Sequence, residues 1–573
     1  MSVQKFIFKA KASNFAKIPG SPIAYWVGEK MLKAFEGKRE IGESFAFREG
    51  IHTANNDRFL RMWHEVSRNK FVLGALCYKD IDERGRWVPY NKGGEFRRWY
   101  GNNDFVIGFD LGYRNEMLQL KGHVWPSQNL YFKEGGTWTA VTTGAFGVRY
   151  FPKGFLFDAG GQVAIGNNIL GCIAYLNSVL FNAIAKVTMP TINYKCGIVK
   201  TLPNLILEDE VIESNVTALI DLSRSDWDEY ETSWDFKVNP LVREGWQRNG
   251  SAMSLETAWA AVFARRMEWA ARMKALEEEN NRLFIKAYGL EDELKPDVEW
   301  KDVSITGNPF YRYKVDAGVD AARPESAPYQ GVPPELEAKA RADAMRELIS
   351  YGMGVLMGRY SLEQEGLILA SQGELYKDYL ARVHGAGKIL PDEDGVIPAI
   401  SLEGNFFRDN LLHRMREFLS VAFGNDTLPK NLNFIEAALG CGFDKYLTDK
   451  FFDDHVKTYK KRPIYWLFES PKGYFRAFAY MHRMTGATAG HIRNNYLLPY
   501  IGHLEKCFAA ESAKGSSMTS AERKRVKAME AAIKDCKAYD LVLHDFADRA
   551  VAIDLDDGVV VNWAKYKEVL ASL

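Results

Sequence analysis

Near residue 206 the sequence changes character, and this change limits the folds open to the chain. Residues 1–205 are rich in glycine, aromatic and β-branched residues that are broken by short polar turns. Runs bounded by glycine or proline predict short strands there; they are FVIGFD, NLYFKEG, WTAVTTG, FGVRYF, GFLFDAGG and QVAIGNN. Helices are expected after Pro22, in AYWVGEKMLKAFE, and in NILGCIAYLNSVLFNAIAKV, which is apolar on most faces and is therefore expected to be buried.

Beyond residue 206 most of the sequence predicts helix. Residues 256–290 contain helix formers throughout, with apolar residues three and four positions apart, so we expect one long helix that ends near Gly289. The next run predicts a linker or exposed loop because it carries four prolines among small residues: Pro324, Pro328, Pro333 and Pro334. After it, HIRNNYLLPYIGHLEKCF and AERKRVKAMEAAIKDCKAYDLVLHDFADRAV predict a helical hairpin with AKGSSMTS as its turn.

Together these patterns predict an α+β chain of three parts. We expect a mixed α/β domain at 1–205, a helical connector with the proline-rich loop at 206–334, and a mostly helical C-terminal domain at 335–573. A chain of 573 residues is too long for one core, which agrees with several domains.

Composition excludes several classes of protein. The 74 Lys and Arg balance 74 Asp and Glu, so any site for a polyanion must be local. The six cysteines are scattered without a close pair, which argues against a disulfide scaffold and a zinc ribbon and fits a reducing cytosol. No apolar run reaches the roughly 18 residues of a membrane span, and MSVQKFIFKAKASNF lacks the apolar stretch of a signal peptide. We therefore expect a cytoplasmic protein without a membrane partner.

No set of residues predicts a catalytic centre. GNPFYRY places Asn308 and Pro309 before Phe310 and Tyr311. It lacks the second proline of the Asn-Pro-Pro-aromatic loop with which amino-methyltransferases hold a flipped base. A turn is therefore the better interpretation, and no Gly-x-Ser-x-Gly elbow is present either.

Glycine-rich and acidic runs do not predict a cofactor or a metal. FLFDAGGQVAIGNN matches neither a dinucleotide fingerprint nor a phosphate-binding loop, so Asp158 to Gly161 is interpreted as a bend between two strands. Asp453, Asp454 and His455 are adjacent, and adjacent helical residues point about 100° apart, so they cannot all face one ion. PDEDGV and DLDDGV lack the twelfth-position glutamate of a calcium loop, and the ten histidines form no His-x-x-x-His pair.

One stretch combines residue types that rarely occur together. GRWVPYNKGGEFRRWYGNND, residues 85–104, carries five aromatic residues, with Lys92, Arg97 and Arg98 among them. Between residues 58 and 101, ten Lys and Arg stand against five Asp and Glu, and such a local excess attracts phosphates. Amides and guanidinium groups read base edges, and glycines let backbone amides approach a phosphate. Two interpretations stay open: a nucleic-acid-binding loop, or core aromatics with solvated arginines around them.

Several stretches, read as wholes, resemble one family. Among them are IPGSPIAYWVGEKM, FREGIHTANNDRFLRMWHEV, WVPYNKGGEFRRWYGNND, NLYFKEGGTWTAVTTGAFGVRYFPKGFLFD, HVKTYKKRPIYWLFESPKGYF and DLDDGVVVNW. They resemble, in order along nearly the whole chain, the second half of PglX, the adenine-specific DNA methyltransferase family of BREX phage defence. YLNSVLFNAIAKVTMPTINYKCGIVKTLP is similar to the end of target-recognition domains in related restriction–modification proteins.

The resemblance implies a division of labour. In that family the cofactor cradle and the Asn-Pro-Pro-Tyr loop lie in the upstream half. This chain is therefore expected to be a truncated, split or separately encoded specificity half that binds double-stranded DNA through a domain within residues 1–205. Catalysis and S-adenosylmethionine are expected on a partner or a missing N-terminal half, with no cofactor bound here.

The resemblance also favours the nucleic-acid interpretation of residues 85–104. Lys92, Arg97 and Arg98 are expected to neutralise phosphates, and Asn102 and Asn103 to reach base edges. The full set of expected DNA-binding residues is Arg86, Lys92, Arg97, Arg98, Tyr100, Asn102, Asn103, Lys133, Thr137, Trp138 and Arg149. Two other functions stay open. One is a complete methyltransferase that uses the Asn308 and Asp158 segments; the other is a scaffold that assembles BREX proteins or is bound by a phage DNA-mimic inhibitor.

Overall fold

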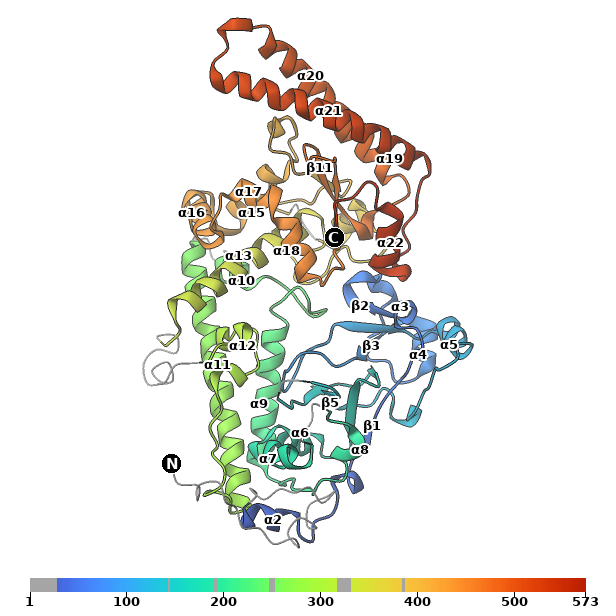
Figure 1. Cartoon of the computed structure of the whole chain (residues 1–573), viewed down its shortest axis with the longest axis vertical. Helices are drawn as coiled ribbons and strands as arrows, with labels where there is room; N and C mark the ends of the chain where they lie inside the picture. The colour runs from blue at the N-terminus through green and yellow to red at the C-terminus, as the bar shows by residue number, and fades with distance from the viewer. Residues whose placement is uncertain (1–27, 143–144, 190–192, 247–252, 317–330, 384–386) are drawn as a thin grey trace, which may run out of the picture. The chain divides into compact units, whose positions relative to one another are not determined.

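A computed structural model describes residues 28–142, 145–189, 193–246, 253–316, 331–383 and 387–573 (Figure 1). Contacts group the chain into two compact units, each built from three separate segments. Unit 1 comprises Met1–Trp63, Lys70–Trp227 and Phe263–Leu336, and unit 2 comprises His64–Asn69, Asp228–Val262 and Glu337–Leu573. Each unit combines helices with sheet, so the predicted α+β class is confirmed. The functional division at residues 205 and 334 remains a prediction.

Two four-stranded sheets form the β part of unit 1. The first is antiparallel in the order β1–β8–β5–β6, with strands Ala46–Arg48, Gly161–Ile165, Gly135–Thr139 and Arg149–Phe151. The second has the order β2–β4–β3–β7, with strands Leu60–Met62, Phe105–Gly108, Trp87–Asn91 and Leu156–Phe157, and β3 pairs with β7 in parallel. All residues of β3 and β8 are buried, as in strands that are covered on both faces.

Five of the six predicted runs contain a strand, although only Trp138 and Thr139 of WTAVTTG belong to β5, and residues 143–144 of that run lie outside the described residues. NLYFKEG is not a strand, because its first residues belong to the 3₁₀ turn Gln128–Leu130 and the chain then bends at Phe132, where φ is 66°. Strands β1, β2 and β3 were not predicted. The first two have only three residues each, and β3 contains Pro89, which lowers strand propensity.

The buried helix expected at 168–187 is in fact two helices, α6 (Ile169–Asn177) and α7 (Val179–Thr188), which are bent by 66°. Ser178 lies between them, and its Oγ accepts a hydrogen bond from the Phe181 N–H at 3.1 Å, which caps α7. Within the described residues no single helix is long and apolar enough to cross a membrane, whereas the bent α6–α7 pair meets that criterion by length and composition.

Two long helices complete unit 1. They are α9 (Glu210–Trp227) and most of α11 (Leu255–Ala287), and Asn215 Nδ2 of α9 donates to Asn280 Oδ1 of α11 at 3.0 Å. Helix α11 confirms the predicted long helix, and Gly289 follows its end with φ of 63°. The shorter helices are α2 (Glu29–Phe35), α3 (Asn56–Phe59), α4 (Tyr78–Arg84), α5 (Leu111–Leu118), α8 (Cys196–Val199) and α12 (Pro309–Tyr313).

Unit 2 is mainly helical, as predicted, but it also contains an unpredicted antiparallel sheet in the order β10–β11–β9 (Tyr465–Glu469, Arg476–Tyr480 and Val396–Pro398). Helices α20 (Leu498–Ser512) and α21 (Ser520–Asp548) form the predicted hairpin, drawn in red in Figure 1. Pro324 and Pro328 of the predicted loop lie outside the described residues. The other helices are α10 (Pro240–Gly245), α13 (Pro334–Leu356), α14 (Tyr376–Arg382), α15 (Leu411–Phe423), α16 (Leu428–Leu439), α17 (Phe443–Asp449), α18 (Phe451–Thr458), α19 (Thr488–Ile492) and α22 (Gly558–Tyr566).

Candidate nucleic-acid interface

The basic stretch, residues 85–104, lies within unit 1, and its two adjacent arginines are buried. Arg97 is 3% exposed. Its Nη2 donates to Asp226 Oδ2 at 2.6 Å, and its Nε donates to the Tyr100 carbonyl at 2.8 Å. Asp226, on α9, is fully buried and also accepts hydrogen bonds from the backbone N–H groups of Thr306 and Gly307. This ion pair therefore ties the basic stretch to two segments that are far away in the sequence.

Arg98 forms a second buried ion pair, with Glu277 of α11. Arg98 Nη1 donates to Glu277 Oε2, and Trp99 Nε1 donates to Glu277 Oε1, both at 2.6 Å. Burial raises the pKa of the Glu277 carboxyl, and the contacts with Arg98 and Trp99 oppose that rise. A buried carboxylate of this kind is tolerated only because a cation and a second donor satisfy it.

These contacts favour the structural interpretation for the middle of the basic stretch. Trp87 and Trp99 are buried, as are Tyr100 and Asn103. A guanidinium that is paired with a buried carboxylate can bind a phosphate only if that pair breaks, which leaves an uncompensated buried charge. DNA contact by Tyr100, Asn103 and the two arginines stays a prediction, and it would require this packing to open.

Three members of the predicted set within the basic stretch keep partial access to solvent. Arg86 and Lys92 each face a carboxylate, at 2.7 and 3.4 Å, and the Lys92 side chain is 28% exposed. Asn102 has φ of 58°, and its amide donates to the Glu95 carbonyl at 2.8 Å. Arg86 and Lys92 therefore each already have a counter-charge.

The second predicted group is divided between the core and the surface. Thr137 and Trp138 of β5 are buried, and their side chains donate to backbone carbonyls. Arg149 of β6 is buried as well, but its Nε has no hydrogen-bond partner among the described residues, and burial lowers its pKa to about 10. Of these four residues only Lys133 is exposed.

Lys133 belongs to an open pocket of about 630 Å³, which we call the lysine pocket. It is lined by Leu76, Cys77, Tyr78, Gln128, Asn129, Tyr131, Phe132, Lys133 and Lys153. Glycines allow the loop before Leu76 and the loop that carries Lys153 to touch, since a Cβ on Gly154 would lie only 2.7 Å from the Gly74 Cα. The loop that carries Lys133 is held against Lys153 by a hydrogen bond from the Gly154 N–H to the Phe132 carbonyl at 3.0 Å.

The lysine pocket offers the side chains of a nucleic-acid surface. Lys133 and Lys153 are exposed, and neither forms an ion pair with a described residue; no carboxylate lines the pocket. Gln128 and Asn129 contribute amides, and the Tyr78 hydroxyl donates to Gln128 Oε1 at 3.1 Å. Cations bind phosphates, amides read base edges, and aromatic faces stack on unpaired bases. The sequence did not reveal this site because its residues come from three loops that are far apart along the chain.

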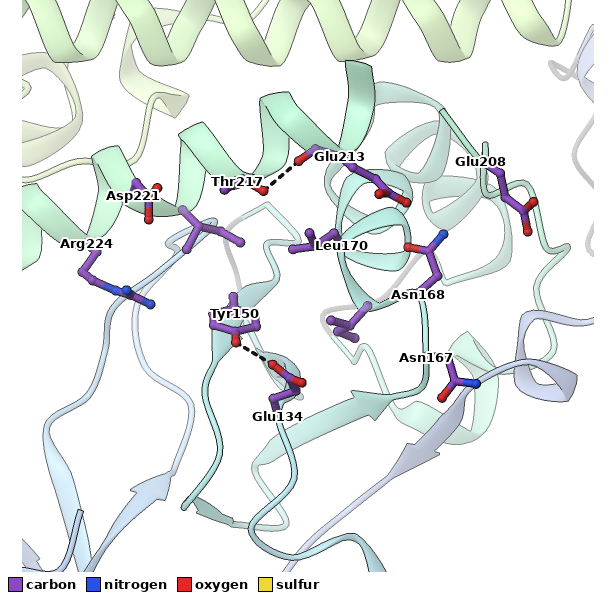
Figure 2. Close-up of a pocket in the computed structure, with 12 residues that line it drawn as sticks. Glu134, Tyr150, Asn167, Asn168, Leu170, Glu208, Glu213, Thr217, Asp221 and Arg224 are labelled. Atoms are coloured by element: carbon purple, nitrogen blue, oxygen red, sulfur yellow. Dashed lines mark hydrogen bonds between the residues drawn. The ribbon is translucent and has the colours of Figure 1, made fainter. Parts of the chain in front are cut away.

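A second pocket of unit 1, of about 710 Å³, has the opposite charge. Figure 2 shows Glu134, Glu208, Glu213 and Asp221 around it, and Arg224 is the one cation among the residues that line it. Tyr150 donates to Glu134 Oε2 at 2.8 Å. Burial, which is the larger cause, and this hydrogen bond together raise the pKa of Tyr150 to about 12. Four carboxylates against one guanidinium repel phosphates, so this pocket does not suit a nucleic-acid backbone.

The segment considered for catalysis has a structural role. Asn308 is fully buried, and its Oδ1 accepts from the Phe310 N–H, which caps α12. Its Nδ2 donates to the carbonyls of Trp300 and Val303 at 2.7 and 3.0 Å. Asn308 therefore has a structural role, but the segment after it is the short helix α12 and not the turn that was predicted.

The glycine pair and the acidic run are structural too. The Gly160 N–H donates to Asp158 Oδ1 at 2.7 Å in the bend between β7 and β8. His455 is buried, and its Nε2 accepts from two backbone N–H groups, whereas Asp454 accepts from the Tyr446 hydroxyl. These neighbouring side chains have different hydrogen-bond partners.

Unit 2 brings together three potential metal ligands that the sequence did not predict: Glu403, His503 and Cys507. The sequence does contain a His-x-x-x-Cys spacing at His503 and Cys507, but a search for pairs of histidines does not detect it.

Comparison with known proteins identifies relatives of the whole chain, although no protein-family model matches it. The adenine-specific methyltransferase BrxX of Escherichia coli O9:H4 (strain HS) is 32% identical over 591 aligned residues, which cover 98% of this chain and 46% of the relative. The adenine-specific methyltransferase PglX of Lacticaseibacillus casei (strain Zhang) is 33% identical over 594 aligned residues, which cover 98% and 45%. The chain is thus homologous to these methyltransferases and spans about half the length of the curated relatives it matches.

Proposed function

We propose, from this homology to about half of two adenine-specific methyltransferases, that the chain is the DNA-recognition part of such an enzyme. The single observation that carries the proposal is the coverage, which is almost complete for this chain and close to half for each relative. A DNA adenine methyltransferase must hold a duplex and turn the target base out of it. The proposed role of this chain is the first of these tasks.

Methyl transfer is proposed to depend on a partner or an additional N-terminal half that supplies S-adenosylmethionine. In support, the nearest match in this chain to a base-binding loop begins at Asn308, which is buried and engaged in capping a helix. Calorimetric titration of the chain with S-adenosylmethionine should therefore give no stoichiometric heat. Binding at micromolar concentration would instead favour a complete methyltransferase.

The lysine pocket is proposed as the main DNA-contacting surface. It keeps Lys133 from the set predicted by sequence and adds Lys153, Gln128, Asn129 and Tyr78. Its two lysines offer charge without first breaking an ion pair within the described residues, in contrast to Arg97 and Arg98. Lys92 and Asn102, which are partly exposed, are proposed as secondary contacts.

Duplex binding by the full chain tests this assignment. The double variant Lys133→Ala, Lys153→Ala should weaken binding by about tenfold or more at low salt, and should lower the slope of log affinity against log salt by about 2, because two phosphate contacts are lost. The matched control is Lys30→Ala, Lys301→Ala, which removes two lysines of the same unit that already pair with carboxylates at 2.6 and 2.9 Å. Equal behaviour of the two double variants would reject the lysine pocket as the DNA surface.

A further inference from the structure

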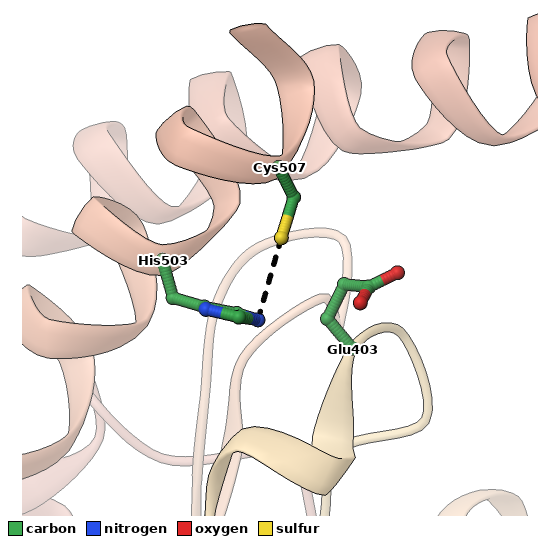
Figure 3. Close-up of side chains that lie close together, drawn as sticks. All are labelled: Glu403, His503 and Cys507. Atoms are coloured by element: carbon green, nitrogen blue, oxygen red, sulfur yellow. Dashed lines mark hydrogen bonds between the residues drawn. The ribbon is translucent and has the colours of Figure 1, made fainter. Parts of the chain in front are cut away.

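Glu403, His503 and Cys507 meet beside the α20–α21 hairpin of unit 2 (Figure 3). His503 and Cys507 lie one turn apart on the same face of α20, and Glu403 directly precedes the 3₁₀ turn Gly404–Phe406. One potential ligand atom from each side chain lies within 4.8 Å of the other two. All three residues are partly exposed, so an ion can reach them from solvent.

The spacing of the two ligands on α20 suits a tetrahedral ion. His503 Nε2 and Cys507 Sγ are 3.5 Å apart. Zinc bonds of about 2.0–2.1 Å to nitrogen and 2.3 Å to sulfur, at a tetrahedral angle, place these atoms about 3.6 Å apart. The ion could therefore bind without rearrangement of α20. A thiol hydrogen bond has a similar length, so the experiment has to distinguish the two.

The other contacts of these side chains leave ligand atoms available. The His503 ring stacks on Phe406, with centroids 4.4 Å apart and planes 16° apart, which fixes its orientation. Arg525 donates from Nε and Nη2 to the same oxygen of Glu403, Oε1. Glu403 Oε2 accepts no hydrogen bond from the described residues, so it can bind an ion while the contact with Arg525 persists.

Charge balance favours a cation at this place. Arg525 pairs with both Glu403 and Glu511, and Glu511 Oε2 is buried without a hydrogen-bond partner among the described residues. Two carboxylates against one guanidinium leave an excess negative charge, and ligation adds another because Cys507 binds a metal as the thiolate. A divalent cation would offset the excess that results.

We propose that Glu403, His503 and Cys507 form a zinc site with water as the fourth ligand. Thiolate, imidazole and carboxylate are the ligand types of Zn²⁺, and three protein ligands with access to solvent correspond to a site with one open position. Bound zinc would fasten α20 to the segment that carries Glu403, and would thereby stabilise the base of the hairpin.

Cobalt serves as the probe because Co²⁺ takes the same ligands and is coloured. The full chain, freed of metal by a chelator that is then removed, should bind one Co²⁺ with a thiolate-to-cobalt charge-transfer band in the near ultraviolet, and Zn²⁺ should displace it. Cys507→Ser should abolish the band. Cys441→Ser, which changes another partly exposed cysteine, should keep it. Absence of the band, or its survival in Cys507→Ser, would overturn the proposal.

A second measurement uses the unchanged chain, so misfolding of a variant cannot obscure it. Zn²⁺ should slow alkylation of Cys507 by iodoacetamide, measured by mass spectrometry of the peptide, while exposed Cys77 reacts at the same rate with and without the ion. Zn²⁺ should also raise the midpoint of thermal unfolding, because a ligand of the folded state stabilises it. Unchanged alkylation of Cys507 at saturating zinc would contradict the site.

Discussion

The basic stretch and the lysine pocket are two regions of unit 1 that share the same side-chain types and differ in what faces them. Both combine cations, amides and aromatic rings. In the basic stretch, Arg97 and Arg98 each meet a carboxylate at 2.6 Å on a helix far along the chain. In the lysine pocket, no lining residue is acidic. The position of carboxylates therefore separates a structural use of these residues from a binding use, and composition alone does not.

The largest effect is expected when a buried carboxylate of the basic stretch is removed. Asp226→Ala leaves the buried Arg97 charge without its counter-charge and two backbone N–H groups without their acceptor, so the free energy of unfolding should fall by about 3–5 kcal/mol. Urea unfolding followed by circular dichroism measures this fall. Glu116→Gln, at the partly exposed ion pair with Arg58, is the control and should cost less than about 1 kcal/mol. Equal costs would remove the distinction between buried and exposed pairs.

Replacement of Arg149 is expected to raise the free energy of unfolding, in contrast to replacement of Asp226. Its pKa, lowered to about 10 by burial, lies below the unfolded value of 12.5, so its charge opposes folding at neutral pH. Arg149→Met keeps an unbranched side chain, although a shorter one, and removes the charge, and should raise the free energy of unfolding by about 1–3 kcal/mol. A loss of stability in the same urea experiment would show that the guanidinium is compensated in the folded chain.

The difference between the two regions can be removed by placing a carboxylate in the lysine pocket. Leu76 lines the pocket and is 67% exposed, so its replacement should not disturb the core. Leu76→Glu should weaken duplex binding by about tenfold at low salt and lower the salt slope by about 1, because one lysine then faces a counter-charge. Leu76→Gln has nearly the same shape and should bind as the parent chain does. Similar loss in both variants would indicate a steric cause instead.

The smallest effect concerns an aromatic ring of the lysine pocket. Tyr78→Leu should reduce affinity for single-stranded or base-flipped DNA by about fivefold, since one stacked base is worth about 1 kcal/mol at the low end. The salt slope should not change. Tyr78→Phe keeps the ring and loses only the hydrogen bond to Gln128, so binding should stay at the parental level. A changed salt slope in Tyr78→Leu would mean that the ring positions a lysine.

Sequence predicts the fold well where a signal is local. The long helix α11 and the α20–α21 hairpin follow from helix propensity and spacing, and both are present. The sheet of unit 2 was not predicted, because short strands such as Val396–Pro398 have little periodicity of their own and form through pairing with distant partners. The single helix expected at 168–187 is divided into two helices, because Ser178 caps the start of the second one within an apolar run.

The candidate site was less predictable for the same reason. Local sequence shows that Arg97 and Arg98 are close to aromatic rings, but it does not show that Asp226 and Glu277 neutralise them. Lys133 was included in the predicted set, whereas Lys153 was not, because the two are brought together by the hydrogen bond from the Gly154 N–H to the Phe132 carbonyl, which local sequence does not reveal. A local count of charges therefore does not distinguish cations that are paired with distant carboxylates from cations that are not, and DNA contact by the predicted residues stays a prediction.

The long sequence separation of the two buried ion pairs has a consequence for biosynthesis. The carboxylates follow their arginines by 129 and 179 positions, so at about 5–20 residues per second a ribosome needs roughly 6 to 40 s to supply them. During that interval the nascent chain presents two unneutralised guanidinium groups beside exposed indoles. A fragment that stops at residue 205 would keep this state permanently, because Asp226 and Glu277 lie beyond its end. Binding of polyanions by such a fragment would then report on incomplete folding rather than on site recognition.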